Sequence, residues 1–128
     1  MRLLLDTCAF LWLCAEPERL SQPAKDAIRN PDHEVWLSAA SIWECALKNR
    51  NGRLPLPSDP ARYLADQRRA HGIAALPIDE DACAQIGKLP DHHRDPFDRI
   101  LVCQAIVSGL TIVTPDELLA RYPVPIYW

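Results

Sequence analysis

The sequence predicts an α/β protein in which helices cover a mainly parallel β-sheet. Short apolar segments alternate along the chain with longer segments of helical character, and the connections between them are short. This alternation is typical of parallel sheets covered by helices. The composition is that of an ordinary globular protein, with 48% hydrophobic and 24% charged residues among 128. We therefore expect residues 1–128 to form a single domain with a sizeable core.

The first half of the chain begins with a strand and is then mostly helical. Ser21 can cap a helix that has Pro23 in its first turn, and Asn30 followed by Pro31 ends it. A proline-rich segment, residues 53–60, is predicted to form a rigid connection between two helices. The predicted elements are a strand at Arg2–Leu5, helices at Thr7–Ala15 and 21–28, a strand at Val35–Leu37, and helices at Ala39–Lys48 and Ala61–His71.

The second half repeats the alternation more regularly. Its most strongly predicted element is the helix at Pro96–Ser108, because proline favours the first helical turn and Gly109 supplies a stop. The remaining predicted elements are strands at Ala75–Ile78, Thr111–Thr114 and Val124–Tyr127, and helices at Asp79–Lys88 and Glu117–Arg121.

Composition excludes several functional classes. A net charge of −3 creates no global basic field, so any contact with nucleic acid needs local basic groups. Only four glycines are present and no glycine-rich phosphate loop occurs, which disfavours a nucleotide-binding enzyme. The five cysteines form no CxxC pair and are expected to be buried free thiols in a reducing cytoplasm. No apolar run is long enough for a membrane helix, so a cytoplasmic protein is expected.

Four acidic residues each follow or flank a short apolar segment. They are Asp6 in RLLLDT, Glu44 in SAASIWE, Asp98 in HRDPFDRILVCQA and Asp116 in TIVTPDE. In a parallel sheet these positions lie at one edge, where α/β proteins bind ligands. Carboxylates gathered without cations repel one another, and a hard divalent metal such as Mg²⁺ or Mn²⁺ relieves that repulsion. The sequence therefore suggests a metal-dependent enzyme that acts on phosphate esters.

Each acid also has a structural interpretation: Asp6 can be the exit of its strand to solvent, and Asp98 can take a capping-box role at the start of its helix. Glu44 fits a capping box with Ser41, unless Ser38 is the cap, in which case Glu44 lies further inside the helix. Asp95 precedes a proline and suits the N-cap of the following helix, which favours Asp98 over Asp95 as a metal ligand. Asp116 can cap the short helix that follows it.

The chain resembles the PIN-domain family, and most closely its VapC-type toxin ribonucleases. The segments that carry the resemblance are LLLDT, LSAASIWECALK, HRDPFDRILVCQA and TIVTPD, in the family's order. The resemblance implies an α/β/α sandwich and an Mg²⁺- or Mn²⁺-dependent endoribonuclease that leaves 5′-phosphate and 3′-hydroxyl ends. It also implies a cognate antitoxin and a homodimer.

The resemblance assigns the family's acidic site to Asp6, Glu44, Asp98 and Asp116, both as catalytic residues and as metal ligands. Thr114 matches the hydroxyl before the last acid. Thr7 can support the site through its hydroxyl or cap a helix, and Asp95 is a possible addition. No acidic position departs from the family pattern.

RNA requires basic groups near these acids. The residues expected to contact RNA are Lys48, Arg50, Arg94 and Arg99. His92 and His93, in the polar loop before Asp95, are interpreted as solvent-exposed or RNA-contacting. Two other functions remain open: a phosphatase or DNA nuclease with the same metal site, and a non-catalytic binding module in which the acids only cap helices.

Overall fold

A single five-stranded parallel sheet organises the protein. The computed structural model describes every residue from Met1 to Trp128, and its strand order is β3-β2-β1-β4-β5 with all neighbouring pairs parallel. This confirms the predicted fold class. The strands are β1 (Arg2–Leu5), β2 (Glu34–Ser38), β3 (Ala74–Leu76), β4 (Thr111–Val113) and β5 (Ile126–Tyr127).

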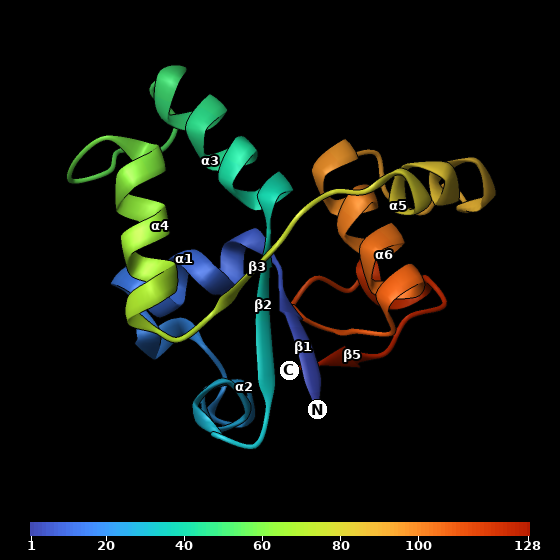
Figure 1. Cartoon of the computed structure of the whole chain (residues 1–128), viewed down its shortest axis with the longest axis horizontal. Coiled ribbons are helices and arrows are strands. Elements are labelled where there is room, and N and C mark those ends of the chain that lie inside the picture. The colour runs from blue at the N-terminus through green and yellow to red at the C-terminus, as the bar shows by residue number, and fades with distance from the viewer.

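Helices cover both faces of the sheet. In Figure 1, α1, α2 and α4 lie on one side, α5 and α6 lie on the other, and α3 extends beyond the carboxyl end of β2. The α-helices are α1 (Thr7–Ala15), α2 (Gln22–Arg29), α3 (Ala39–Arg50), α4 (Pro60–Ala70), α5 (Glu80–Gln85) and α6 (Pro96–Ser108). Three short 3₁₀ helices, Pro17–Arg19, Ile86–Lys88 and Leu119–Arg121, complete the fold.

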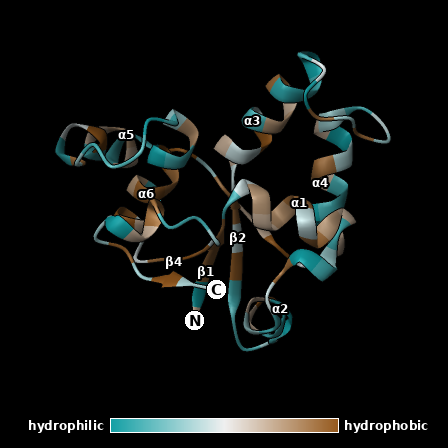
Figure 2. Cartoon of the chain, turned by 180° about the vertical axis from the view of Figure 1, so that it is seen from behind, coloured by the Kyte–Doolittle hydropathy of each residue, from teal (hydrophilic) through white to brown (hydrophobic).

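The sheet divides the hydrophobic core in two. Successive side chains of a strand point to opposite faces, so Leu3 and Leu5 pack with α1 and α2 while Leu4 packs with α6. In β4, Ile112 and Val113 divide in the same way. Figure 2 shows the strands as hydrophobic ribbons between helices whose outer faces are hydrophilic. The central strands β1 and β4 are therefore buried on both faces, as their apolar sequences require, whereas β3 at one edge exposes Ala75.

Proline shortens two predicted strands. β3 ends at Leu76, before Pro77, and β5 begins at Ile126, after Pro125. Proline has no N–H to donate to the sheet, so pairing stops beside it. The predicted helix at Glu117–Arg121 is also shorter, because it is a single 3₁₀ turn at Leu119–Arg121.

The cysteines are all free, as expected, but they differ in exposure. Cys45 and Cys103 are buried, whereas Cys8 and Cys14 are half-buried. Cys83 is exposed on α5, so the expectation that all five thiols are buried was wrong for this residue. No helix of the protein is both long and apolar enough to cross a membrane.

The strand order reverses next to β1, and this reversal locates the site. From β1 the chain moves outward through β2 and β3, then returns to place β4 on the other side of β1. At such a reversal, the segments that follow two neighbouring parallel strands leave the sheet in different directions. The crevice between them, at the carboxyl ends of the strands, is where α/β proteins bind ligands. Asp6 directly follows β1, and Thr114 directly follows β4.

Candidate metal centre

Asp6 and Thr114 meet at the ends of adjacent strands. Leu5 pairs with Val113, so the residues that follow them lie side by side. The Thr114 hydroxyl donates a hydrogen bond to Asp6 Oδ2, and the backbone N–H of Ala9 donates to Asp6 Oδ1 at 2.7 Å. Asp6 is thus the N-cap of α1 and is 95% buried, with 5% of its surface exposed. Its carboxylate is held rigidly at the floor of the crevice.

Glu44 reaches the crevice from α3. Ser38 caps this helix, accepting a hydrogen bond from the Ala40 N–H at 3.0 Å, so the alternative capping box with Ser41 does not form. Glu44 is buried, and its Oε1 accepts from the Thr7 hydroxyl at 2.7 Å. The Lys48 ammonium donates to Oε2 at 2.5 Å. Thr7 therefore orients Glu44 and does not cap α1.

Asp95 and Asp98 have different roles at the start of α6. Asp95 is the N-cap, because its Oδ1 accepts from the Phe97 N–H at 2.9 Å. Asp98 occupies the third helical position and accepts no backbone hydrogen bond. Its side chain is 19% exposed and faces the crevice. The arrangement leaves Asp98 free to bind a ligand while Asp95 holds the helix end.

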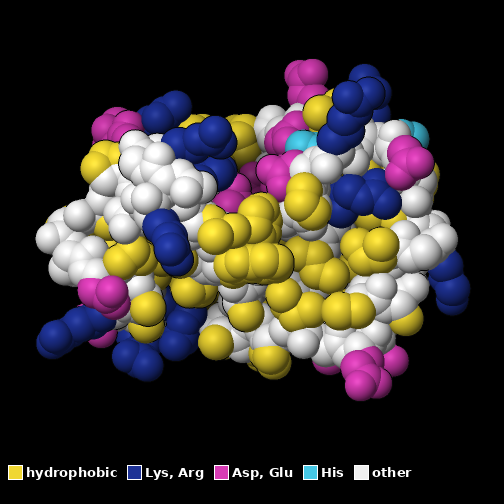
Figure 3. Space-filling view, turned by 90° about the horizontal axis from the view of Figure 1, so that it is seen from above, with side chains coloured by type: hydrophobic (Ala, Val, Ile, Leu, Met, Phe, Trp, Pro, Cys, Tyr) yellow, Lys and Arg dark blue, Asp and Glu magenta, His cyan; other side chains and the backbone are white.

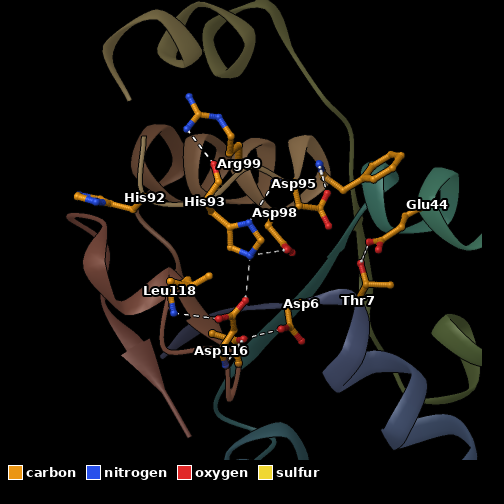
Figure 4. A network of polar contacts seen from close by, with 12 residues as sticks. Asp6, Thr7, Glu44, His92, His93, Asp95, Asp98, Arg99, Asp116 and Leu118 are labelled. Atoms are coloured by element: carbon orange, nitrogen blue, oxygen red, sulfur yellow. Dashed lines mark hydrogen bonds and ion pairs between the residues drawn. The ribbon is translucent and has the colours of Figure 1, made fainter. Parts of the chain in front are cut away.

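Asp116 completes the group from the segment after β4. Its Oδ1 accepts from the Leu118 N–H at 2.9 Å, and its own N–H donates to the Thr114 hydroxyl oxygen at 3.0 Å. Asp116 therefore closes a turn just before the 3₁₀ helix Leu119–Arg121, which has Leu118 as its N-cap and no side-chain cap, so the expectation that Asp116 caps this helix was wrong. Its Oδ2 lies 3.1 Å from His93 Nε2 (Figure 4).

These side chains line one pocket of about 400 Å³. Figure 3 shows acidic side chains in a hollow of this face, with Lys and Arg side chains on either side. The carboxylates come from the β1–α1 junction, α3, the start of α6 and the segment after β4. The lining residues are Asp6, Thr7, Cys8, Leu11, Trp12, Glu44, Lys48, Asp95, Asp98, Pro115 and Asp116.

His93 belongs to this group, although the sequence placed it on the surface or against RNA. Its Nε2 lies 3.2 Å from Asp98 Oδ2 and 3.1 Å from Asp116 Oδ2. Figure 4 shows the imidazole pointing between the two carboxylates, whereas His92 points away. The position of His93, five residues before Asp98, was the only sequence signal available, and a polar loop gave no reason to direct it inward.

Burial and mutual repulsion disfavour the charged forms of Asp98 and Asp6 when no cation is bound. Burial, followed by the charge of Asp95, raises the pKa of Asp98 from 3.8 to about 7. The pKa of Asp6 rises from 3.8 to about 6, mainly through burial, although hydrogen bonds from Thr114 and Ala9 oppose the shift. Asp116 and Glu44 add repulsion at Asp6. The site therefore favours either protons or a bound cation.

The basic residues expected to contact RNA fall into two groups. Lys48, Arg50 and Arg94 have exposed side chains, although Lys48 is paired with Glu44. Arg99 is largely buried, with 15% of its side chain exposed, and its Nη1 donates to the Pro90 carbonyl at 3.1 Å. The Arg99 side chain therefore anchors the loop before α6.

The donor set suits a hard divalent ion. One ligand atom each from His93, Asp98 and Asp116 lies within 4.8 Å of the others, and Asp6 and Glu44 line the same pocket. Carboxylate oxygens are the ligands that Mg²⁺ and Mn²⁺ prefer. The residues that would hold such an ion are Asp6 and Asp98, with Glu44 and Asp116 beside them.

The fold and this acidic crevice define the PIN class of proteins, and the sequence comparison agrees. The model of the PIN domain family matches residues 3–125, so the chain belongs to that family. It is a VapC-type member. Ribonuclease VapC22 of Mycobacterium tuberculosis is 33% identical over 126 residues, which cover 96% of this chain and 95% of the relative. Ribonuclease VapC16 of the same organism is 36% identical over 72 residues, about half of each chain.

Solved structures share the fold. VapBC2 from Rickettsia felis, bound to a DNA fragment from its promoter, superposes with a TM-score of 0.69 at 14% identity, covering 100% of this chain and 99% of that one. VapBC-1 from nontypeable Haemophilus influenzae gives a TM-score of 0.69 at 15% identity, covering 99% and 97%. These low identities support the architecture alone.

Proposed function

We propose that this chain is a Mg²⁺- or Mn²⁺-dependent endoribonuclease and the toxin of a toxin–antitoxin pair. The observation that carries the proposal is the convergence of five carboxylates, from four separate parts of the fold, on one pocket. Support for RNA as the substrate comes from its relatives, since VapC22 and VapC16 are both named ribonucleases. RNA as the substrate would make the cytoplasm the place of action.

In this proposal Asp6 and Asp98 are the main metal ligands, with Glu44 and Asp116 completing the acidic site. A bound Mg²⁺ or Mn²⁺ would supply an activated water and neutralise charge on the scissile phosphate. Thr114 holds the Asp6 carboxylate in place through its hydroxyl. In-line attack of water would leave 5′-phosphate and 3′-hydroxyl ends, so no histidine general base is needed.

The exposed basic side chains at the rim would hold the RNA backbone. Lys48 and Arg50 lie on α3, and Arg94 lies in the loop before α6. Arg94 forms no hydrogen bond or ion pair within the protein, so its guanidinium is free to contact a phosphate. Such contacts position RNA without reading its sequence and weaken as salt rises.

Cleavage of a panel of nucleic acids tests the proposed activity. Purified, metal-stripped protein is incubated with structured RNA, single-stranded RNA, DNA and p-nitrophenyl phosphate, with Mg²⁺, Mn²⁺ or EDTA. We expect cleavage of RNA only, with either metal, and none in EDTA. Asp98→Asn should lower the rate by at least about 100-fold, because the enzyme loses a metal ligand and with it several kcal/mol of charge stabilisation.

Asp81→Asn is the matched control, since Asp81 is an exposed acid on α5 outside the pocket. It should cleave as the unmodified protein does. Cleavage of DNA or of the monoester at a comparable rate would instead favour a DNA nuclease or a phosphatase. RNA cleavage that persists in EDTA would contradict the metal-dependent mechanism.

The proposed partners are an antitoxin protein and a second copy of the chain. The VapBC names of the similar solved structures support an antitoxin, and the acidic pocket would suit a basic side chain from it. Light scattering of the purified protein should give twice the 14.4 kDa chain mass if the homodimer forms. A mass of one chain at micromolar concentration would argue against the dimer.

A further inference from the structure

His93 lies between two of the acids, Asp98 and Asp116, although no part of the proposed mechanism uses it. Its side chain is 15% exposed, and its Nε2 is within hydrogen-bond distance of two carboxylates that come from different parts of the fold. Asp98 belongs to α6, and Asp116 belongs to the segment after β4. The imidazole therefore links the two segments at the point where they face each other (Figure 4).

Contacts from elsewhere in the fold fix the position of this imidazole. The His93 N–H donates to the Tyr122 hydroxyl oxygen at 2.8 Å, and the His93 carbonyl accepts from Arg99 Nη1 at 3.4 Å. Arg99 Nη1 also lies 3.3 Å from the Tyr122 hydroxyl. The loop that carries His93 is thus anchored to α6 and to the C-terminal segment, and the ring is pre-placed.

The hydrogen bond at the other ring nitrogen identifies the donor atom. The backbone N–H of Asp95 points at His93 Nδ1, at a distance of 3.1 Å. A backbone N–H can only donate, so Nδ1 accepts and carries no proton. We assign the ring proton to Nε2 on this basis. The atom that faces Asp98 and Asp116 is therefore an N–H donor, which has no lone pair to offer a metal.

We propose that His93 is a positioning residue, whose Nε2–H orients the carboxylates of Asp98 and Asp116 for metal binding. This inference rests on the proposed function. His93 Nε2 hydrogen-bonds to Asp116 Oδ2 and lies 3.2 Å from Asp98 Oδ2, and Asp116 Oδ1 accepts from the Leu118 N–H. Asp98 Oδ1 is left without a hydrogen bond and is available to a cation. Partners that orient metal ligands in this way typically contribute 10–100-fold to metal affinity, as an approximate range.

The competing role is a direct metal ligand. A ligand role for Nε2 would require the ring proton to move to Nδ1, and the Asp95 N–H would then lose its acceptor. The hydrogen bond from Asp95 to Nδ1 therefore opposes a ligand role. The two roles predict different ion preferences. Both ions prefer oxygen ligands, but Mn²⁺, a transition metal, accepts an imidazole nitrogen more readily than Mg²⁺ does. Loss of a ligand would therefore weaken Mn²⁺ binding selectively, whereas loss of a positioning residue would weaken the binding of both ions.

Calorimetric titration of metal-stripped protein with Mg²⁺ and, separately, with Mn²⁺ distinguishes these roles. The variants are His93→Ala, His93→Gln and, as the control from the same loop, His92→Ala. We expect His93→Ala to bind both ions about 10–100-fold more weakly. His93→Gln should recover most of the affinity, because its amide N–H can occupy the place of Nε2–H. His92→Ala should bind both ions as the unmodified protein does.

Three results would overturn the positioning role. They are unchanged affinities in His93→Ala, a selective loss of Mn²⁺ binding, and His93→Gln as weak as His93→Ala. Thermal melts of the His93→Gln variant show whether it is folded. An altered metal affinity in a folded variant then reflects the metal site and not a loss of structure. If the unmodified protein bound neither ion, the proposed metal-dependent function itself would fail, and that outcome differs from every result that concerns His93 alone.

Discussion

At the scale of single residues, a carboxylate can cap a helix and line the metal pocket at the same time. Asp6 accepts the Ala9 N–H with one oxygen and the Thr114 hydroxyl with the other, yet it faces the crevice. Asp98 differs because no backbone N–H stabilises its charge. Asp6 can therefore both cap a helix and bind a metal. Asp98 caps no helix, so only the metal-binding interpretation applies to it.

The raised carboxyl pKa values predict how the stability of the metal-free protein depends on pH. The pKa of Asp98 is about 7 and that of Asp6 about 6 in the folded protein, against an ordinary 3.8. Between about pH 4 and 7 the folded state therefore binds more protons than the unfolded state, so the free energy of unfolding falls as pH rises. Urea denaturation of metal-stripped protein at pH 5 and pH 8 should show lower stability at pH 8.

Asp98→Asn should remove much of this dependence and make the metal-free protein more stable at pH 8. The amide carries no charge to be buried or repelled. Asp81→Asn, an exposed control, should keep the original pH profile. If Asp98→Asn were instead less stable by about 1 kcal/mol, Asp98 would be acting as a helix cap.

The sequence could name the acids of the site but not the histidine among them. Each acid follows an apolar segment, so the topology of a parallel sheet is enough to bring them to one edge. His93 reaches the same place only through tertiary contacts with Tyr122, 29 positions later, and with Arg99. Nothing local directs a residue of a polar loop inward, which is why the structure was needed to find it.

At the scale of elements, one serine fixes the helix that delivers Glu44. Ser38 caps α3 and also donates to the side-chain oxygen of buried Gln104 on α6 at 2.6 Å. Ser38→Ala should lower the free energy of unfolding by about 2–3 kcal/mol, with roughly 1 from the lost cap and the rest from the unpaired buried oxygen. Chemical denaturation measures this difference.

Ser21→Ala provides the comparison, because Ser21 caps α2 and makes no other side-chain hydrogen bond. It should cost only about 1 kcal/mol. Equal losses in the two variants would mean that the Ser38–Gln104 contact adds nothing to stability.

The predicted elements were accurate where local signals are strong and less so where proline competes with sheet pairing. The helix Pro96–Ser108 has the same bounds in the structure, because Asp95 caps it and Gly109 ends it with a positive φ of 66°. The last strand, in contrast, contains Pro125 and pairs only from Ile126. Apolar character alone therefore overestimated the length of that strand.

At the scale of the whole molecule, the sheet separates two cores that should contribute independently to stability. Leu3→Ala on one face should cost about 2–5 kcal/mol and Ile112→Val on the other about 0.5–1.5. In the double variant these costs should add to within about 0.5 kcal/mol, because the two side chains pack in different clusters. Denaturant titration of the single and double variants measures the sum.

Leu4→Ala with Ile112→Val is the contrasting pair. These residues are direct neighbours in the sheet and share one core. Their combined cost should depart from the sum by more than about 0.5 kcal/mol. If the costs of both pairs added equally well, the sheet would not divide the core into two parts that stabilise the protein independently.

The strand β1 and the pocket at its carboxyl end depend on residues far later in the chain. β1 needs β4, at Thr111–Val113, to pair its second edge, and the pocket needs Asp116 beyond it. A nascent chain on the ribosome therefore lacks the assembled pocket until Asp116 has emerged. Truncated products that stop before Asp116 should therefore lack the assembled pocket, however well their first strands fold.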